Sequence, residues 1–386
     1  MVIKIFESLE KVPPGQWAKV APMDFPFASY SFLWTLEKTA CLGHRTGWLP
    51  CYVTLWNSEE LLAAIPLYSK SNSYGEYIYD FAWAQAFESF GLRYYPKLTS
   101  AIPFTSATGP KILLAKNLSP EDRRSASKMI LSSMLELFQE SKSSSLHALF
   151  ITEDEIPIFR DEGFFIRHSF QYHWGNEDYL QFSDFLQKLR SKRRKETTRE
   201  RIQAQASGLR ISRLTGSALK PSHAEAMFHF YRNTAEKKAG FEYLTPEFFL
   251  QIFEQMKDQI LFVYAEKQDG QPVAGALNFF GPNTLYGRNW GCLEEYKSLH
   301  LEICYYQGIE FAIERKIQLF EAGAQGEHKF QRGFLPRLTY SAHRIRDKTL
   351  STAIGNFIEE EKRQIDLLLE DYRAQTPFSR DPLISK

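Results

Sequence analysis

The chain is poor in cysteine and has no long apolar run. Its 386 residues include four cysteines, Cys41, Cys51, Cys292 and Cys304, and no two of them form a CxxC pair. Such a set is too small for a disulfide scaffold and lacks zinc-ligand spacing, so we expect a reducing, cytoplasmic location and no metal. The longest clean apolar run, Leu61–Leu67, is far shorter than the roughly 20 residues that span a bilayer. The sequence therefore predicts no transmembrane segment.

Signatures of three common catalytic classes are also missing. The glycine-containing segment GAQGEHK (323–329) lacks the spacing of a P-loop, and neither GxGxxG nor GxSxG occurs. Nucleotide hydrolysis, hydride transfer and serine hydrolysis are therefore disfavoured, and we expect no required cofactor. The formal net charge is only +1, so the field of the whole molecule cannot select a polyanion. A local patch would have to hold such a partner.

One such patch is present in the run KLRSKRRKETTRER (188–201), where eight basic residues outnumber two acidic ones. Apolar anchors stop at Leu189, so the next turns of a helix here would not face a core. The run is either a solvated helix face or a surface that binds phosphates of nucleic acid, nucleotide or anionic lipid. In the second case Arg193 and Arg194 would hold a phosphate-rich donor.

The segment Leu285–Phe334 concentrates the features of a functional site. An aromatic strand, LYGRNWG (285–291), leads to a helical pattern over Leu299–Lys316 and then to a short strand, Gln318–Glu321. A charged loop containing two glycines follows. Strand, helix, strand and loop form one βαβ unit whose polar groups lie at the carboxyl end of a strand.

Two groups of side chains in this segment are candidate site residues. Alternation along the first strand would present a phenol, a guanidinium and an indole on one face, although structural packing would also account for them. These residues are Tyr286, Arg288 and Trp290. The loop brings together acid/base and anion-binding side chains, which would otherwise form a salt-bridged surface. The loop set is Glu321, Glu327, His328, Lys329 and Arg332.

The order of predicted elements occurs twice along the chain. A strand hairpin, strand, helix and strand in the first half have counterparts in the second, which also carries helices over Ser222–Lys238 and Thr245–Asp258. We therefore expect two related α/β halves, with a boundary near Arg167–Tyr179. From about Ser351 onward the sequence predicts one amphipathic helix followed by a polar tail.

Several long motifs in one order make the chain similar to the FemAB-like branch of the GNAT acyltransferase superfamily, a group associated with peptidoglycan biosynthesis or recognition. The first half contributes YDFAWAQAF, GLRYYPKL and PFTSATGPKILL. The second contributes LRSKRRKETTRER, AGFEYLTPEFF, LYGRNWG, FEAGAQGEHKFQRGF and PRLTYSAHR. The resemblance implies two tandem GNAT-like domains, each a mixed central sheet flanked by helices. These would cover residues 1–170 and 171–350, followed by a C-terminal helix and tail over 351–386.

The resemblance also implies an N-acyltransferase that moves an activated acyl or aminoacyl group to an amine. In the better understood Fem enzymes the donor is aminoacyl-tRNA and the acceptor is a peptidoglycan precursor. Candidate partners are therefore tRNA and a lipid-linked precursor, met at the inner face of the membrane. The expected base is Glu327 or His328, and Tyr286 would donate a proton to the leaving group. The expected clamp on phosphate or oxyanion is Lys329 with Arg288 and Arg332, while Trp290 and Glu321 would contact substrate.

Two departures from the family pattern leave the donor open. Residues 216–258 have room for only two short helices, so the coiled-coil arm of some Fem enzymes is absent. The turn after Trp290, GCLEEYKS, lacks the Q/RxxGxG/A loop of acetyl-CoA-using relatives. Three other functions compete: a non-catalytic module that recognises cell-wall precursors, an acyl-CoA-dependent N-acetyltransferase, and a peripheral membrane protein whose basic helix binds anionic lipid.

Overall fold

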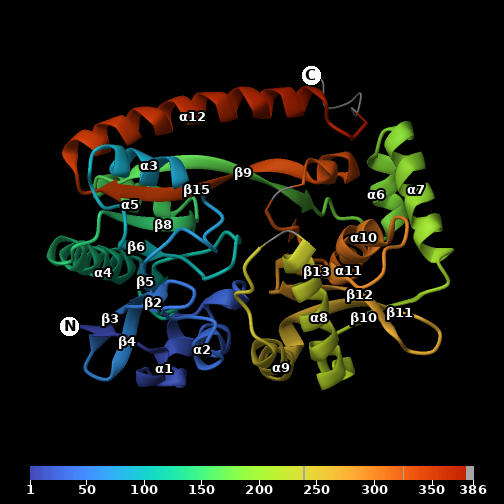
Figure 1. Ribbon diagram of the computed structural model, residues 1–386, viewed down its shortest axis with the longest axis horizontal. Helices are drawn as coiled ribbons and strands as arrows, with labels where there is room; N and C mark the ends of the chain where they lie inside the picture. Colours follow the sequence, from blue (N-terminus) through green and yellow to red (C-terminus); the bar gives the residue numbers. More distant parts are fainter. Residues whose placement is uncertain (238–239, 325, 380–386) are drawn as a thin grey trace. The chain divides into compact units, whose positions relative to one another are not determined.

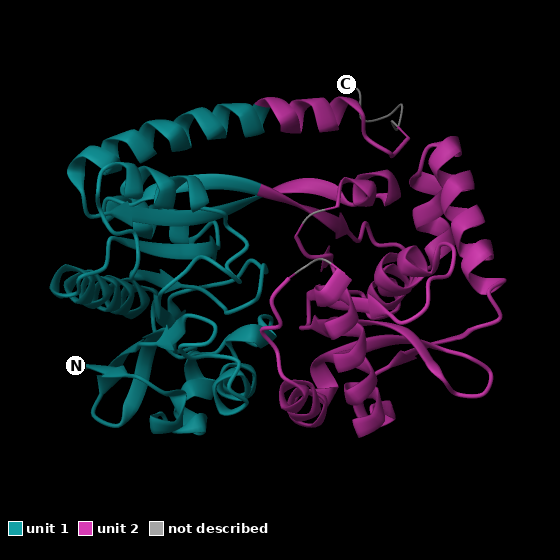
Figure 2. Cartoon of the chain, in the orientation of Figure 1, with its two compact units in different colours: residues 1–169, 338–366 teal, residues 170–337, 367–386 magenta. Residues whose placement is uncertain are grey.

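The computed structural model describes residues 1–237, 240–324 and 326–379, which form two compact units. Unit 1 comprises Met1–Ser169 with Leu338–Asp366, and unit 2 comprises Phe170–Arg337 with Leu367–Lys386 (Figure 2). Leu338–Asp366 thus groups with unit 1, although the sequence placed it in the second domain and the tail. Spatial units need not coincide with evolutionary domains, so the three-part division stays a prediction.

Unit 1 contains two sets of strands and a group of helices (Figure 1). An antiparallel sheet has the order β1 (Val2–Phe6), β3 (Tyr52–Asn57), β4 (Glu60–Ile65), β7 (Leu113–Leu114). The second set has the order β2 (Trp48–Pro50), β5 (Leu67–Lys70), β6 (Lys97–Ser100), β8 (Ser145–Ile151), β15 (Leu335–Ile345). The helices are α1 (Pro14–Val20), α2 (Tyr30–Lys38), α3 (Phe81–Ser89), α4 (Pro120–Glu140) and α5 (Glu155–Asp161). Helix α12 (Lys348–Ala374) belongs to unit 1 as far as Asp366, and its last turns group with unit 2. In this set β6 and β8 run parallel.

Helix α4 shows how the sequence sets a boundary. The Ser119 side chain accepts a hydrogen bond from the Asp122 N–H, and Pro120 occupies the first turn, where its missing N–H costs nothing. Ile130, Met134 and Phe138 then repeat at helical spacing and are buried against the β strands of unit 1. The helix that the sequence predicts over Ser119–Phe138 is thus confirmed, and it extends to Glu140.

Unit 2 is one mixed sheet with helices. Its strand order is β10 (Arg210–Leu214), β11 (Ile260–Glu266), β12 (Pro272–Phe280), β13 (Thr284–Cys292), β14 (Leu319–Glu321), β9 (Phe165–Gly175). Only the β13–β14 pair is parallel among these pairings. The helices are α6 (Phe182–Lys188), α7 (Ser191–Gln205), α8 (Pro221–Lys237), α9 (Pro246–Gln255), α10 (Leu299–Leu301) and α11 (Gln307–Glu314). A π-helical turn, Glu302–Tyr306, joins α10 to α11.

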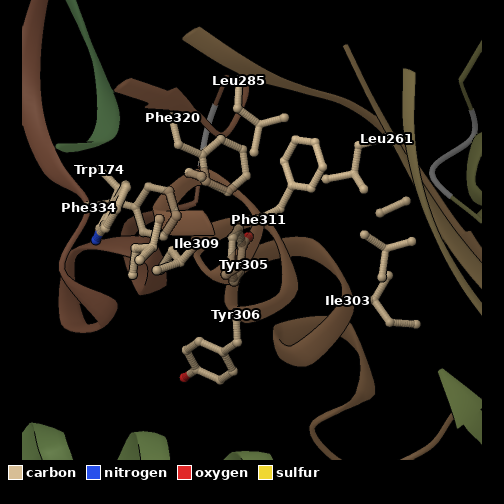
Figure 3. Close-up of a cluster of buried hydrophobic side chains, with 14 of the residues drawn as sticks. Trp174, Leu261, Leu285, Ile303, Tyr305, Tyr306, Ile309, Phe311, Phe320 and Phe334 are labelled. Atoms are coloured by element: carbon tan, nitrogen blue, oxygen red, sulfur yellow. The ribbon is translucent and has the colours of Figure 1, made fainter. Parts of the chain in front are cut away.

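The helix α10–α11 packs its apolar face on β13 and β14. Figure 3 shows Ile309 and Phe311 of this helix in one cluster with Leu285 of β13 and Phe320 of β14. A Cβ at Gly308 would lie 2.6 Å from the Phe320 ring, so only glycine allows this close approach. The predicted strand–helix–strand unit is confirmed, and the fold is the mixed α/β class that the sequence indicated. Within the described residues, no helix is both long enough and apolar enough to cross a membrane.

Candidate functional site

A cavity of about 630 Å³ lies in unit 2 beside β13. Strand β12, helix α8 and the turn after β13 line part of it, and three further segments contribute most to the argument below: β13, the first turns of the helix that follows, and the loop after β14. The residues from these segments include Gly287, Arg288, Asn289, Trp290, His300, Cys304, Tyr305, Gly326, His328 and Lys329. Its size lies within the usual range for small-molecule sites, about 300–1,000 Å³.

The cavity opens where a strand pairing ends. The parallel pair β13–β14 has three registered positions, the last of which is Tyr286 opposite Glu321. Strand β13 continues to Cys292, so its backbone beyond Tyr286 borders the cavity instead of β14. Backbone N–H and C=O groups at such an edge require partners, and a ligand can supply them.

A β-bulge changes the direction of β13 at this point. Asn278 of β12 pairs with Gly287, but Leu277 pairs with Asn289, so Arg288 is the additional residue. The predicted alternation of Tyr286, Arg288 and Trp290 on one face is therefore wrong. Tyr286 is 4% exposed and does not line the cavity, whereas Arg288 and Trp290 do. Bulges often redirect side chains next to sites in this way.

Lys329 is a buried cation in the wall of the cavity. Its side chain is 3% exposed, and its ammonium donates to the Gly323 carbonyl at 2.8 Å. Burial lowers the pKa of Lys329 to about 8, while the neighbouring Cys304 acts in the opposite direction. At neutral pH Lys329 is still mostly protonated, so it can contact an anion or a polarised carbonyl oxygen. Gly323 and Gly326 have φ of +80° and +101°, a backbone shape that favours glycine and places Lys329 here.

His328 and Tyr305 form a hydrogen-bonded pair on the same wall. The distance from Tyr305 Oη to His328 Nε2 is 2.8 Å. Burial, followed by the charges of Arg332 and Lys329, lowers the pKa of His328 below its usual range, so the imidazole is neutral near pH 7. Burial raises the pKa of Tyr305, which keeps its phenol protonated. The pair can therefore pass a proton from the cavity to the imidazole.

His300 extends this aromatic group. Its ring centroid lies 4.8 Å from that of Trp290 and 5.8 Å from that of His328. None of His300, Cys304 and Tyr305 was a candidate site residue from the sequence. Their positions on the helix, five or fewer residues apart, were the available signal, but the direction in which they face depends on the fold.

The two cysteines at the cavity are poor candidates for nucleophiles. Burial raises the pKa of the Cys304 thiol, and it also raises that of Cys292. A thiol must lose its proton to attack a carbonyl efficiently. A cysteine nucleophile is therefore disfavoured at this cavity. In the described ranges, no group of three or more His, Cys, Asp or Glu side chains is arranged to hold a metal ion.

Three predicted loop residues lie outside the lining of the cavity. Arg332 forms two hydrogen bonds with the Glu200 carboxylate, at 2.6 and 3.1 Å, and donates to the His328 carbonyl at 2.6 Å. Glu321 is buried within β14, and Glu327 is exposed. Arg332 therefore links the loop to α7, and the roles of all three as substrate or catalytic groups stay predictions.

Most of the basic run lies in α7, and only some of its cations form ion pairs within the protein. Arg201 pairs with Glu302 and Glu310 at 3.0 and 2.7 Å, which docks the helix on α10–α11. Arg193 pairs with Glu196 at 2.7 Å, and Arg194 lies 3.5 Å from the Gln187 carbonyl. Lys192, Arg194, Lys195 and Arg199 are exposed. The exposed face suits phosphate binding as well as plain solvation, so both interpretations stand.

Comparison with known proteins adds a family to this geometry. The FemAB-like family model, described as peptidoglycan biosynthesis/recognition, matches residues 8–380. No curated protein matches the chain in sequence.

Solved structures share the fold at low identity. FemX has 11% identity and a TM-score of 0.50, with 85% of this chain and 94% of that chain covered. L-PGS from Bacillus licheniformis has 9% identity and a TM-score of 0.51, with 84% and 95% covered. The C-terminal DUF2156 domain of an Agrobacterium fabrum protein has 10% identity and a TM-score of 0.54, with 88% and 93% covered. Structural similarity at such low sequence identity supports a shared fold alone, so function must be argued from the site.

Proposed function

The chain belongs to the FemAB-like family, and from that premise we propose that unit 2 transfers an activated acyl group, in first place an aminoacyl group, to an amine acceptor. One observation supports this above others: the β13–β14 pairing ends in a cavity whose wall carries the Tyr305–His328 pair and the Lys329 ammonium. Acyl transfer to an amine needs a proton acceptor and a stabiliser of the carbonyl oxygen within one small space.

The reaction assigned to the cavity is direct substitution. The neutral acceptor amine attacks the carbonyl carbon of the donor, a C–N bond forms, and the ester or thioester bond to the leaving group breaks. The proton lost by the amine passes to the Tyr305 oxygen as the phenolic proton moves to His328 Nε2. Lys329 faces the negative charge that develops on the carbonyl oxygen, and the leaving group takes a proton from solvent.

The family and the charge distribution support one class of donor and one class of acceptor above others. A phosphate-rich donor such as aminoacyl-tRNA suits the exposed cations of α7, while acyl-CoA is the alternative donor. The association of the family with peptidoglycan favours a peptidoglycan precursor as the amine acceptor. FemX and L-PGS share the fold, which agrees with transfer of an aminoacyl group but leaves this chain's own substrates to experiment.

A transfer assay with defined donors tests the proposal. The protein is incubated with a soluble muropeptide precursor and, in separate reactions, with alanyl-tRNA, glycyl-tRNA or acetyl-CoA, and the product is detected by mass spectrometry. We expect an amide product with one donor class, and a rate reduced about 10²–10⁴-fold in His328→Ala, the usual contribution of general acid–base catalysis.

Two further variants make the assay specific. Tyr305→Phe removes the phenolic proton but keeps the ring, so it should slow transfer with little change in fold. Lys257→Met changes an exposed lysine of unit 2 and should have no effect. Retention of full activity by both His328→Ala and Tyr305→Phe would refute the assigned chemistry, and binding of a muropeptide without turnover by any donor would favour a recognition module.

A further inference from the structure

Asn278 of β12 is a buried polar side chain that the reaction assigned above does not use. It is 2% exposed and lines the cavity. A carboxamide carries two N–H donors and one acceptor oxygen, and each of these groups needs a partner when it is buried. The partners of the nitrogen and of the oxygen therefore indicate what the side chain does.

The nitrogen of this amide is occupied within the protein. Nδ2 donates to the Leu261 and Ala276 carbonyls, both at 3.2 Å. A carbonyl oxygen can only accept, so these two contacts fix which end of the amide is the nitrogen. Both N–H groups are thereby used, which leaves Oδ1 as the atom that can accept a hydrogen bond from a ligand.

Gly287 leaves space beside this oxygen. It pairs with Asn278, and a Cβ on it would lie 3.5 Å from Asn278 Oδ1 and 3.3 Å from Ala322 Cα. A Cβ on Gly323 would in turn lie 3.3 Å from the Gly287 carbonyl oxygen, and the Gly323 carbonyl accepts from Lys329 at 2.8 Å. These contacts place Asn278 and Lys329 on adjoining parts of the cavity wall.

A donor with an α-amino group supplies the hydrogen bond that this oxygen can accept. In the assigned reaction Tyr305 receives the proton of the acceptor amine, and Lys329 faces the carbonyl oxygen of the donor. Asn278, beside Lys329, adds a second hydrogen-bond acceptor to the cavity, and an aminoacyl donor carries a second amine on the carbon next to its carbonyl. A simple acyl group has C–H groups alone at that carbon and would leave the buried oxygen without a donor.

We propose that Asn278 selects aminoacyl donors over simple acyl donors by accepting a hydrogen bond from the α-amino group of the donor. The inference rests on the proposed function, because it concerns the donor of the same reaction. Asn278 takes no part in bond making or breaking and determines specificity alone. A site that pairs with an N–H group of its substrate rejects the analogue that lacks this group, since a buried polar atom of the site then stays unpaired.

Calorimetric titration of the full chain with two stable donor analogues tests the proposal without turnover. The analogues are 3′-amino-3′-deoxyadenosine acylated on its 3′ nitrogen with alanine or with propionate, so they differ in the α-amino group alone. The unchanged protein should bind the alanyl compound about tenfold more tightly, the factor that about 1.4 kcal/mol represents. Asn278→Ala should bind both equally. Asn176→Ala is the matched control: its amide also forms two hydrogen bonds with backbone groups of unit 2, and the tenfold preference should remain.

Transfer from one tRNA acylated with alanine or with propionate provides the second arm. The intrinsic reactivity of the two esters, and any loss of folded protein, cancel when the ratio of the two kcat/KM values is compared between proteins. Asn278→Ala should lower this ratio about tenfold.

The outcomes separate this inference from the proposed function. Equal affinity of the unchanged protein for the two analogues, binding of neither, or the same preference in Asn278→Ala refutes selection by Asn278. A raised KM for the muropeptide with an unchanged donor ratio also refutes it, and assigns the oxygen to the acceptor amine. A preference between the analogues that Asn278→Ala loses, without transfer from any donor, would uphold the selection and refute the proposed function.

Discussion

Each unit contains one parallel strand pair with three registered positions, and the two pairs end differently. In unit 1, β6 and β8 are paired from Leu98–Leu146 to Ser100–Ala148. Beyond that point, the segment around Gly109–Lys111 forms hydrogen bonds with the end of β8. The Gly109 N–H donates to the Phe150 carbonyl at 3.1 Å, and the Lys111 ammonium donates to the same carbonyl at 2.9 Å. In unit 2 the equivalent position beyond β13–β14 is the cavity.

This difference indicates that the end of the strand pair contributes to stability in unit 1 and to chemistry in unit 2. A buried lysine lies near the end of each pair and donates to backbone carbonyls, Lys111 in unit 1 and Lys329 in unit 2. Lys111 is enclosed by its own loop, whereas Lys329 forms part of a cavity wall. Related topology can thus serve as a closed support in one unit and an open site in the other. Changes in unit 1 should alter unfolding, and changes in unit 2 should alter transfer.

The largest effect is expected at Lys97 of unit 1. Lys97→Met leaves the buried Glu76 and Asp80 carboxylates without their closest cation, and breaking a buried pair costs about 3–5 kcal/mol. Urea denaturation measures this destabilisation. Lys19→Met breaks an exposed pair with Glu60 and should cost less than about 1 kcal/mol. Equal destabilisation by the two variants would show that the buried ion pairs of Lys97 stabilise unit 1 no more than an exposed ion pair does.

Lys329→Met should separate activity from stability in unit 2. Without the ammonium the developing oxyanion lacks a donor, so transfer should fall about 10²–10³-fold, or about 2.7–4 kcal/mol of activation energy. Stability should change little, because the lost hydrogen bond to the Gly323 carbonyl offsets the gain from no longer burying a charge. Rates and melting temperatures measured on the same preparation check this. A strongly destabilised variant with near-normal transfer would make Lys329 a structural residue.

The pH dependence of stability gives an independent test of Lys329. Its pKa is about 8 in the folded protein and 10.5 in the unfolded chain, where water surrounds the ammonium. Between these values the unfolded state binds more protons, so stability must rise with pH, by at most about 3 kcal/mol. Relative to Lys329→Met, the unchanged protein should therefore gain stability as the pH rises from about 8 to 10.5. If the curves of stability against pH are parallel for the two proteins, the Lys329 ammonium is exposed to water in the folded protein.

Much of the fold and part of the site follow from the sequence. Periodicity predicted β13, the helix after it and β14, and residue chemistry selected His328 and Lys329 at the cavity. The bulge at Arg288 was not predictable, because it depends on the register between β12 and β13. The Glu200 partner of Arg332, 132 residues away in sequence, is likewise set by tertiary packing.

Lys111→Met tests the closed end of unit 1. The Gly109 and Phe150 carbonyls are left without an ammonium donor, and such unsatisfied buried groups cost about 1–3 kcal/mol. Denaturant midpoints should therefore drop, while transfer per folded molecule stays unchanged. Strongly reduced transfer under conditions where the variant is fully folded would show that the two strand pairs share the chemistry and that unit 1 is more than a support.

The smallest expected effect concerns α7 of unit 2 and the phosphate-binding interpretation of its exposed cations. Changing Lys192, Arg193, Arg194 and Lys195 together to glutamine should weaken binding of a tRNA donor and reduce the slope of log affinity against log salt, by about 0.9 for each phosphate that is no longer neutralised. Affinity measured between low and physiological salt gives both values. A variant of α4 in unit 1, Arg124→Gln with Lys128→Gln, removes exposed cations elsewhere and should change neither. If the α7 variant keeps its affinity and its slope, the run is a solvated helix face. Its structural contributions to unit 2 are then the pairs of Arg201 with Glu302 and Glu310 and the pair of Glu200 with Arg332.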